Sequence, residues 1–450
     1  MVCLDQQRSS PLLRRVLMVI PAIARGGCER QLIATVDGLL RRGYEVEIFA
    51  FTRMHGQASF NDEIAKLGVQ VRFVSEFPVG TGRESGRPAA RALQPYASLL
   101  NLNIEALGEA LQVAIRNFCP DIVHCWSDLA NVVGGLVATN MNVSGIMLSQ
   151  RNVPHTQELA SQPDMFRDAY RQLINSSNLV LVNNSEAGAG QYEEWLDPLP
   201  KKIHVLRNGF MPRGIRIRSG RTRRRACRAR LGLPLQQPVV GAVMRFAPEK
   251  DPDLWIETAA AIAAIRPNVH FILAGYGHSV AELETKIAQL GLARKFVLSG
   301  IGIDVGLIYG AMDVFLSTSR FEGVPNVFLE AQAAGVPVVS PRVGGASEGI
   351  LEGTTGVMVD DRSAESLAEA VVRLLSDSEW RARAAGEGPA FVSRRFGQER
   401  MIEETIALYE KAARGEVSGR EGSGRPFRRG GALCNTERSV RERLSGHSRA

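Results

Sequence analysis

The sequence SRFEGVPNVFLEAQAAGVPVVSPRVGG, residues 319–345, contains the pattern from which the rest of the chain is interpreted. Glu322 precedes a predicted turn, Pro325 stands at the expected first helical position, and Glu330 lies inside that helix. The first backbone N–H groups of a helix have no partner within it, so they can bind an oxygen-rich ligand. Gly335 is the expected left-handed stop, and the apolar run after it predicts a buried strand. Two carboxylates therefore stand beside a donor-rich helix start.

Buried strands and amphipathic helices alternate on both sides of this stretch. Strands are predicted at residues 15–23, 45–51, 69–74, 121–124, 145–149, 178–183, 202–206, 239–245, 269–274, 295–299, 313–317, 336–340 and 356–359. Helices are predicted at residues 28–42, 104–118, 130–140, 252–265, 279–290, 304–311, 363–376, 379–396 and 397–413. Such alternation predicts parallel, doubly wound sheets. Because 450 residues exceed one ordinary hydrophobic core, we expect two domains of α/β class.

The predicted division follows the two series of strands. We expect an N-terminal Rossmann-like domain at residues 14–210, an arginine-rich linker at 211–235, a second Rossmann-like domain at 236–396, a C-terminal helix at 397–413 and a disordered basic tail at 414–450. Ligands of such sheets bind beyond the carboxyl ends of the strands, so facing domains would place a site in the cleft between them. Residues 78–95, rich in Gly, Arg, Pro and Ser, are expected to form a mobile surface loop, either a plain insertion or a lid.

Composition favours a cytoplasmic protein. No apolar run approaches the roughly 20 residues that span a bilayer. Residues 16–24 follow two arginines, as a signal-peptide core would, but the next residues continue as an amphipathic helix, so we expect a first β-strand there. The six cysteines form no CxxC pair, which argues against structural zinc and against a disulfide framework.

The net charge of +7 is concentrated in one segment. Nine arginines and no acidic residue lie between Arg213 and Arg230, whereas acidic residues slightly outnumber basic ones in the rest of the chain. One interpretation is a solvated helix or linker; the other is a peripheral contact with anionic lipid or with a phosphate-bearing substrate. No aromatic pattern of RNA-binding proteins accompanies the arginines, so nucleic acid is not an expected partner.

Cations and glycines stand at the ends of the second domain's strands. Arg245 ends a predicted strand and Lys250 follows across a turn, so both could converge on one anion, although each could also be a plain surface charge. Glycines at 275, 277, 300 and 302 allow close approach of a ligand or merely shape turns. Glu330 interrupts an apolar helix, where an unpartnered carboxylate would be costly. Together these residues suit a sugar nucleotide, with cations on its diphosphate and a carboxylate on its vicinal diol.

At this point the sequence resembles a known family. EGVPNVFLE, residues 322–330, resembles the E-x7-E motif of glycosyltransferase family 4, the retaining enzymes of GT-B fold. ARGGCERQLIATVDGLLRRGYEVEIFA (24–50), HVLRNGF (204–210) and MRFAPEKD (244–251) extend the resemblance, which covers residues 14–413. It implies two facing doubly wound domains and transfer of a sugar, with retention, from a nucleotide-sugar donor to a lipid-linked, polysaccharide or other glycan acceptor.

The resemblance also implies roles for individual residues. Arg245 and Lys250 would stabilise the departing diphosphate, Glu322 would contact the donor sugar, and Glu330 would hold the nucleotide ribose. The remaining donor-binding positions that it implies are Gly26, Gly27, Arg151, Gly302, Gly323, Val324, Pro325, Asn326 and Val327. Such enzymes use a UDP- or GDP-sugar as co-substrate and require no metal and no further cofactor.

One position departs from the family pattern. Many members carry a histidine near the donor sugar where this chain has Gln150 and Arg151, with His155 shortly after; we favour Arg151 as the replacement. His124, at another strand end, is either a packed residue or a ligand. The alternative functions are a related GT-B catalyst, such as a nucleotide-sugar epimerase, and a non-catalytic nucleotide-sugar-binding protein. A phosphorylase is not favoured because no cofactor-lysine pocket is recognisable.

Overall fold

A computed structural model describes residues 13–54, 59–77, 93, 95, 104–154, 162–199, 202–211, 221–277, 280–300 and 304–416. Several predictions fall outside these residues: His155, Gly302, the start of the arginine-rich segment, most of the 78–95 loop and nearly all of the predicted tail. They therefore stay predictions.

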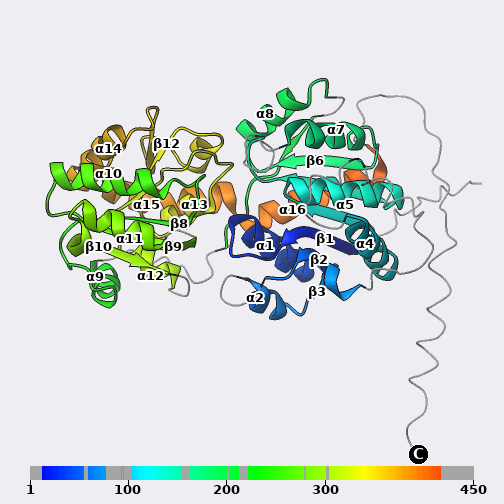
Figure 1. Cartoon of the computed structure of the whole chain (residues 1–450), viewed down its shortest axis with the longest axis horizontal. Coiled ribbons are helices and arrows are strands. Elements are labelled where there is room, and N and C mark those ends of the chain that lie inside the picture. Colours follow the sequence, from blue (N-terminus) through cyan, green and yellow to red (C-terminus); the bar gives the residue numbers. More distant parts are fainter. Residues whose placement is uncertain are drawn as a thin grey trace, which may run out of the picture.

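Two parallel sheets build two domains that lie side by side (Figure 1). In spatial order, the described residues of the first sheet form β3 (Gln70–Phe73), β2 (Glu45–Thr52), β1 (Arg15–Ala22), β4 (Ile122–Trp126), β5 (Gly145–Gln150), β6 (Leu179–Asn183) and β7 (His204–Val205). Those of the second form β10 (Phe296–Ser299), β9 (His270–Gly277), β8 (Val239–Phe246), β11 (Val314–Leu316), β12 (Val338–Pro341) and β13 (Gly356–Val359). In each sheet the strand order reverses beside the first strand, β1 or β8. The predicted doubly wound, GT-B architecture is confirmed.

Helices alternate with these strands, and three of them, at residues 61–65, 163–173 and 186–196, were not among the predicted helices. In the first half they are α1 (Gly27–Arg41), α2 (Asn61–Ala65), α4 (Ile104–Phe118), α5 (Asp128–Asn140), α7 (Pro163–Leu173) and α8 (Glu186–Leu196). In the second half they are α9 (Arg221–Arg230), α10 (Pro252–Ile265), α11 (Val280–Gln289), α12 (Val305–Ala311), α13 (Asn326–Ala333), α14 (Ala364–Ser376), α15 (Ser378–Phe396) and α16 (Gln398–Arg414). None of the described helices is long and apolar enough to cross a membrane.

The chain passes between the domains twice, and the two crossings touch. Phe210 N donates a hydrogen bond to Phe396 O at 2.5 Å, and Phe210 forms an isolated parallel bridge with Gly397. Beyond this point α16 packs against the first domain. The two ring nitrogens of the fully buried His124 lie 2.7 Å from the hydroxyls of Tyr409, on α16, and Ser149, on β5. His124 is therefore a packed residue, which decides between the two interpretations of it.

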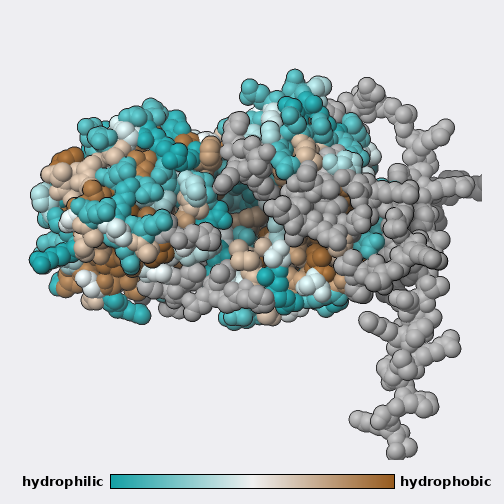
Figure 2. Space-filling view, viewed as in Figure 1, coloured by the Kyte–Doolittle hydropathy of each residue, from teal (hydrophilic) through white to brown (hydrophobic). Residues whose placement is uncertain are grey.

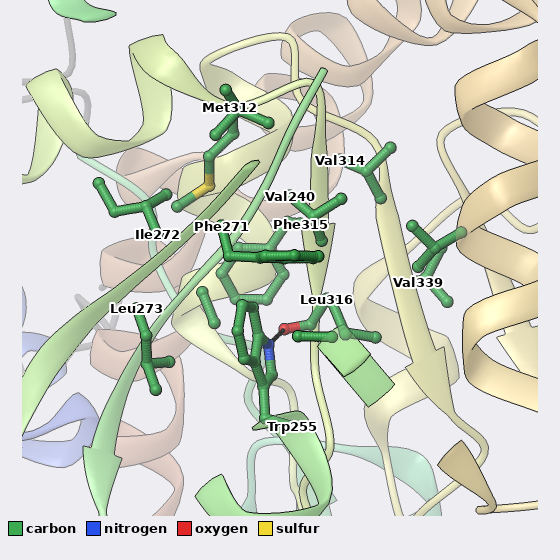
Figure 3. Packing of buried hydrophobic residues seen from close by; sticks show 14 of the residues in the cluster. Val240, Trp255, Phe271, Ile272, Leu273, Met312, Val314, Phe315, Leu316 and Val339 are labelled. Carbon is green, nitrogen blue, oxygen red and sulfur yellow. Dashed lines mark hydrogen bonds between the residues drawn. The ribbon is translucent and has the colours of Figure 1, made fainter. Parts of the chain in front are cut away.

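The core of the second domain fixes the strand that leads into residues 319–345. Trp255, on α10, is fully buried, and its indole N–H donates to the carbonyl oxygen of Leu316 at 3.0 Å (Figure 3). Its ring meets the Phe271 ring edge to face, with centroids 6.2 Å apart. An indole N–H that is both buried and paired holds its partner in place. The last residue of β11 is thereby tied to the core just before the chain enters the candidate site.

Part of the predicted arginine-rich linker is a packed helix. α9 lies against α12, and Arg228 is buried, with Nη2 2.6 Å from Asp313 Oδ2 and Nε donating to Ala311 O at 2.9 Å. Arg224 contacts the same carboxylate at 2.8 Å. Two of the nine arginines thus anchor the helix to the second domain, which sequence composition alone does not reveal.

Candidate active site in the interdomain cleft

A cavity of about 570 Å³ lies between the domains, where the carboxyl ends of β1, β5, β8 and β11 meet. The strand order reverses between β1 and β4 and between β8 and β11, and doubly wound sheets bind ligands at such points. The volume lies within the range of small-molecule sites. Figure 2 shows the two lobes with this junction between them.

The structure brings most of the predicted residues into this one cavity. Its lining includes Gly26, Gly27, Arg151, Arg245, Lys250, Glu322, Gly323, Val324, Pro325, Asn326 and Val327. Glu330 does not line it, for a reason given below. The roles implied for all these residues remain predictions.

Lys250 and Glu322 form an ion pair inside the cavity. Lys250 Nζ lies 2.5 Å from Glu322 Oε1, and the carboxylate is nearly buried. Asp251 has a left-handed backbone, with φ of 52°, which is uncommon for a residue other than glycine. Its side chain pairs with Arg362 and Arg320, and the hydroxyl of Thr318 donates to Lys250 O at 3.0 Å. These contacts hold the Lys250 backbone beside Glu322.

The loop after Glu322 differs from the prediction in one detail. Pro325 is the N-cap, with an extended backbone, and α13 begins at Asn326 rather than at Pro325. Gly335 has φ of 76°, as a left-handed stop requires. Gly323 approaches the first domain so closely that a Cβ there would lie 2.2 Å from Asn184 Oδ1. The loop is therefore enclosed by both domains.

Asn326 connects this loop to the Gly26–Gly27 turn of the first domain. Its Nδ2 donates to Gly27 O at 2.8 Å, while its Oδ1 accepts from Gln31 at 2.9 Å and from Asn208 at 2.8 Å. The glycine turn therefore faces the helix start of α13 across the cleft. Sequence alone left the importance of that turn open.

Glu330 is covered by a residue that sequence reasoning missed. Arg30, on α1 of the first domain, forms an ion pair with Glu330 Oε1, and Tyr309 OH donates to Oε2 at 2.7 Å. The Glu330 side chain is only 8% exposed. The pKa of Arg30 is raised, chiefly by the charge of Glu330. Arg30 lines the cavity and Glu330 does not, so we expect a ligand that binds Glu330 to displace Arg30.

Arg245 and Glu29 place opposite charges on the two walls. Arg245 pairs with Glu249 on its own turn. Burial lowers the pKa of Arg245, but the hydrogen bond and charge of Glu249 outweigh it, so the pKa is raised. Glu29, in the first turn of α1, also lines the cavity, and burial raises the pKa of its carboxyl group while the Arg245 charge opposes that shift. No spacing pattern pointed to Glu29 before its place in the cavity was known.

Arg151 follows β5 on the first-domain wall. Its Nη2 donates to Asn208 Oδ1 at 2.6 Å, and its guanidinium carbon lies 5.0 Å from the centroid of the Trp126 ring. Asn208 Nδ2 in turn donates to Val324 O at 2.8 Å. Arg151 is therefore linked to the loop after Glu322, while the alternative His155 lies outside the described residues.

The fold and the cavity define a two-domain protein of GT-B type, and comparisons with known proteins agree. Residues 223–390, which contain Arg245, Lys250, Glu322 and Glu330, match the family model of glycosyl transferases group 1. HepE of Anabaena, solved in complex with UDP and glucose, superposes with a TM-score of 0.70 at 21% identity, covering 89% of this chain and 100% of that one. Residues 223–390 are thus similar to the group 1 glycosyltransferases, and the likeness to HepE shows the fold of the chain.

Two curated relatives are similar in sequence. The Vi polysaccharide biosynthesis protein VipC/TviE of Salmonella typhi is 30% identical over 318 residues, 67% of this chain and 54% of the relative. The chain thus spans about half the length of that relative. A D-inositol 3-phosphate glycosyltransferase of Corynebacterium urealyticum is 28% identical over 409 residues, 85% of this chain and 90% of the relative.

The described residues contain no group of three His, Cys, Asp or Glu side chains that could hold a metal ion. Metal independence stays a prediction of the family resemblance.

Proposed function

We propose that this protein is a retaining glycosyltransferase of family 4 type that transfers a sugar from a UDP- or GDP-sugar to a glycan acceptor. The observation that carries the proposal is the convergence of Arg245, Lys250 and Glu322 in one interdomain cavity, at the points where both strand orders reverse. Cations there can neutralise a departing diphosphate, which is the main electrostatic task of glycosyl transfer. The similarity to a polysaccharide biosynthesis protein favours a polysaccharide or lipid-linked acceptor.

The residues divide the task as follows. Lys250 and Arg245 hold the diphosphate, and Lys250 exchanges its Glu322 partner for a phosphate oxygen. Glu322 and the backbone of residues 323–327 hold the sugar. Glu330 accepts hydrogen bonds from the ribose diol once Arg30 moves aside, because one carboxylate can accept two O–H bonds. The acceptor hydroxyl then attacks the anomeric carbon of the donor sugar from the face that the phosphate leaves. An oxygen of the leaving phosphate takes the hydroxyl proton, and the anomeric configuration is retained.

A panel of nucleotide sugars tests the activity. Purified protein is incubated with UDP- and GDP-sugars, alone and with candidate glycan acceptors, and release of nucleoside diphosphate is measured. We expect release from one nucleotide class that increases with a suitable acceptor. A protein that binds a nucleotide sugar tightly and never releases the diphosphate would instead be the non-catalytic binding protein, and conversion of the sugar without release would indicate an epimerase.

Cytoplasmic location and peripheral contact with an anionic membrane are parts of the same proposal. They rest on composition and on the arginines of α9, and the membrane contact is tested separately below.

A further inference from the structure

Among the described residues, five basic side chains line the cavity, and four have a carboxylate partner. The pairs are Arg25 with Glu63, Arg30 with Glu330, Arg245 with Glu249, and Lys250 with Glu322. Arg151 is the exception in this part of the chain because it has no carboxylate partner: it contacts the neutral amide oxygen of Asn208 and the ring of Trp126, and the Cys28 thiol is the charge partner that raises its pKa. Its counter-charge is therefore expected from a ligand.

Arg151 is partly buried, and a partly desolvated cation without a carboxylate partner is costly. Burial lowers the pKa of Arg151, which agrees with poor solvation of its charge. The Trp126 face and the Asn208 bond hold the guanidinium in one orientation, and Asn208 takes only one of its five N–H donors. The remaining donors can bind a carboxylate or phosphate through two parallel hydrogen bonds. This is a preorganised anion site.

The position of Arg151 indicates which anion it binds. The donor diphosphate already has Arg245 and Lys250 on the second-domain wall, whereas Arg151 stands on the first-domain wall after β5. Through Asn208 it connects to Val324, in the loop assigned to the sugar. Nearby, Asn184 lies against Gly323, and its buried Oδ1 has no hydrogen-bond partner in the described structure, so it can accept from a sugar hydroxyl. The first-domain wall thus offers a cation and an amide oxygen to the sugar side of the cavity.

We propose that Arg151 selects a substrate that carries an anionic group, a carboxylate or a phosphate, on the sugar side of the cleft. The group belongs either to the transferred sugar or to the acceptor. This inference rests on the proposed function and specifies its substrate class.

The test compares wild-type protein with Arg151→Gln and Arg151→Lys; Arg116→Gln, an exposed arginine of α4 outside the cleft, is the control. Thermal denaturation first establishes that each variant folds. The donor arm measures the affinities for UDP, UDP-glucose and UDP-glucuronate by titration calorimetry. The acceptor arm measures, with UDP bound, the affinities for phenyl glucoside, phenyl glucuronide and glucose 6-phosphate. If the protein binds GDP rather than UDP, GDP and GDP-sugars replace UDP and the UDP-sugars in both arms.

In one arm, we expect wild-type protein to bind an anionic ligand at least tenfold more tightly than its neutral counterpart. Arg151→Gln should remove this preference. It should lower the affinity for the anionic ligand by a factor at least ten times larger than the factor for UDP. Arg151→Lys should keep part of the preference because it retains the charge, and Arg116→Gln should keep all of it. The arm in which the preference appears identifies the donor sugar or the acceptor as its source.

Two results would overturn the inference. Wild-type protein could show no preference for the anionic ligand in either arm, or Arg151→Gln could lower the affinity for UDP as strongly as the affinity for every other ligand. The second would make the diphosphate the anion of Arg151. If wild-type protein bound neither UDP nor GDP, the proposed function itself would be rejected, and this inference with it.

Discussion

Single side chains in the cleft are held by partners that are remote in sequence. Arg30 and Glu330, which form an ion pair, are 300 positions apart, and Arg151 and Asn208 are 57 apart. Glu322 and the residues up to Val327 are contiguous, so their proximity to one another follows from sequence alone. No periodicity or spacing rule relates Arg30 to Glu330. The motif from Glu322 to Glu330 was therefore predictable from sequence, whereas the pairing of Arg30 with Glu330 became apparent only in the three-dimensional structure.

His124 gives a prediction at this scale, because it is fully buried between Tyr409 and Ser149. Burial, and to a lesser degree the charge of Arg151, lowers its pKa well below the ordinary 6.5. Below that ordinary value the unfolded chain takes up a proton that the folded protein does not. The free energy of unfolding should therefore fall with decreasing pH, by about 1.4 kcal/mol per pH unit from this residue.

Urea denaturation between about pH 7.5 and 5 measures this effect in wild-type protein and in His124→Gln. The variant should be less stable at neutral pH and should lose less stability on acidification. His204→Gln is a useful comparison, because His204 is only partly buried and its pKa is lowered to a lesser degree. If the free energy of unfolding changed with pH equally in His124→Gln and wild type, His124 would not be the source of the pH dependence.

At the level of elements, the alternation of strands and helices was largely predictable; the differences lie at element ends, in α9, and in α2, α7 and α8, which were not predicted. Strand β13 and helix α10 have the predicted bounds, whereas β7 is reduced to two residues at the edge of its sheet. From the sequence, the arginine-rich segment could be either a solvated helix or a linker, because the apolar face of α9 is small. It is fixed instead by the buried Arg228 and by Asp313, which is a tertiary contact.

The described structure changes the expected membrane behaviour of α9. Arg224 and Arg228 share Asp313, whereas Arg225 and Arg230 are exposed. Exposed arginines near an anionic surface contribute about 1 kcal/mol each. Arg225→Gln combined with Arg230→Gln should therefore weaken association with phosphatidylglycerol vesicles at low salt.

Co-sedimentation with these vesicles measures the change. The matched control replaces Arg373 and Arg383, which are exposed on α14 and α15, by glutamine and should bind like wild type. Unchanged association of the α9 variant would leave these arginines as a solvated surface.

Across the whole molecule, the domains contact each other through polar groups around the cavity. Besides Arg30 with Glu330, Tyr276 OH donates to Arg25 O at 2.5 Å. The Glu348 carboxylate accepts from the first N–H groups of α8, at Glu186 and Ala187, each at 2.9 Å. A carboxylate at a helix N-terminus is favourable, and polar contacts can exchange partners more readily than apolar ones. We therefore expect donor binding to replace the Arg30–Glu330 pair without disrupting either core.

The central claim is that this cleft binds the nucleotide part of a sugar donor through Lys250 and Glu330. Its most direct test is titration calorimetry of UDP and GDP with wild-type protein, Lys250→Ala and Glu330→Ala. The control is Lys286→Ala, because Lys286 pairs with Asp253 and Glu257 outside the cavity. We predict that wild-type protein and the control bind one of the two nucleotides equally well. Each cleft variant should bind it at least roughly tenfold more weakly, a loss of about 1.4 kcal/mol. Equal affinity of all four proteins, or no binding by wild type, would contradict the account.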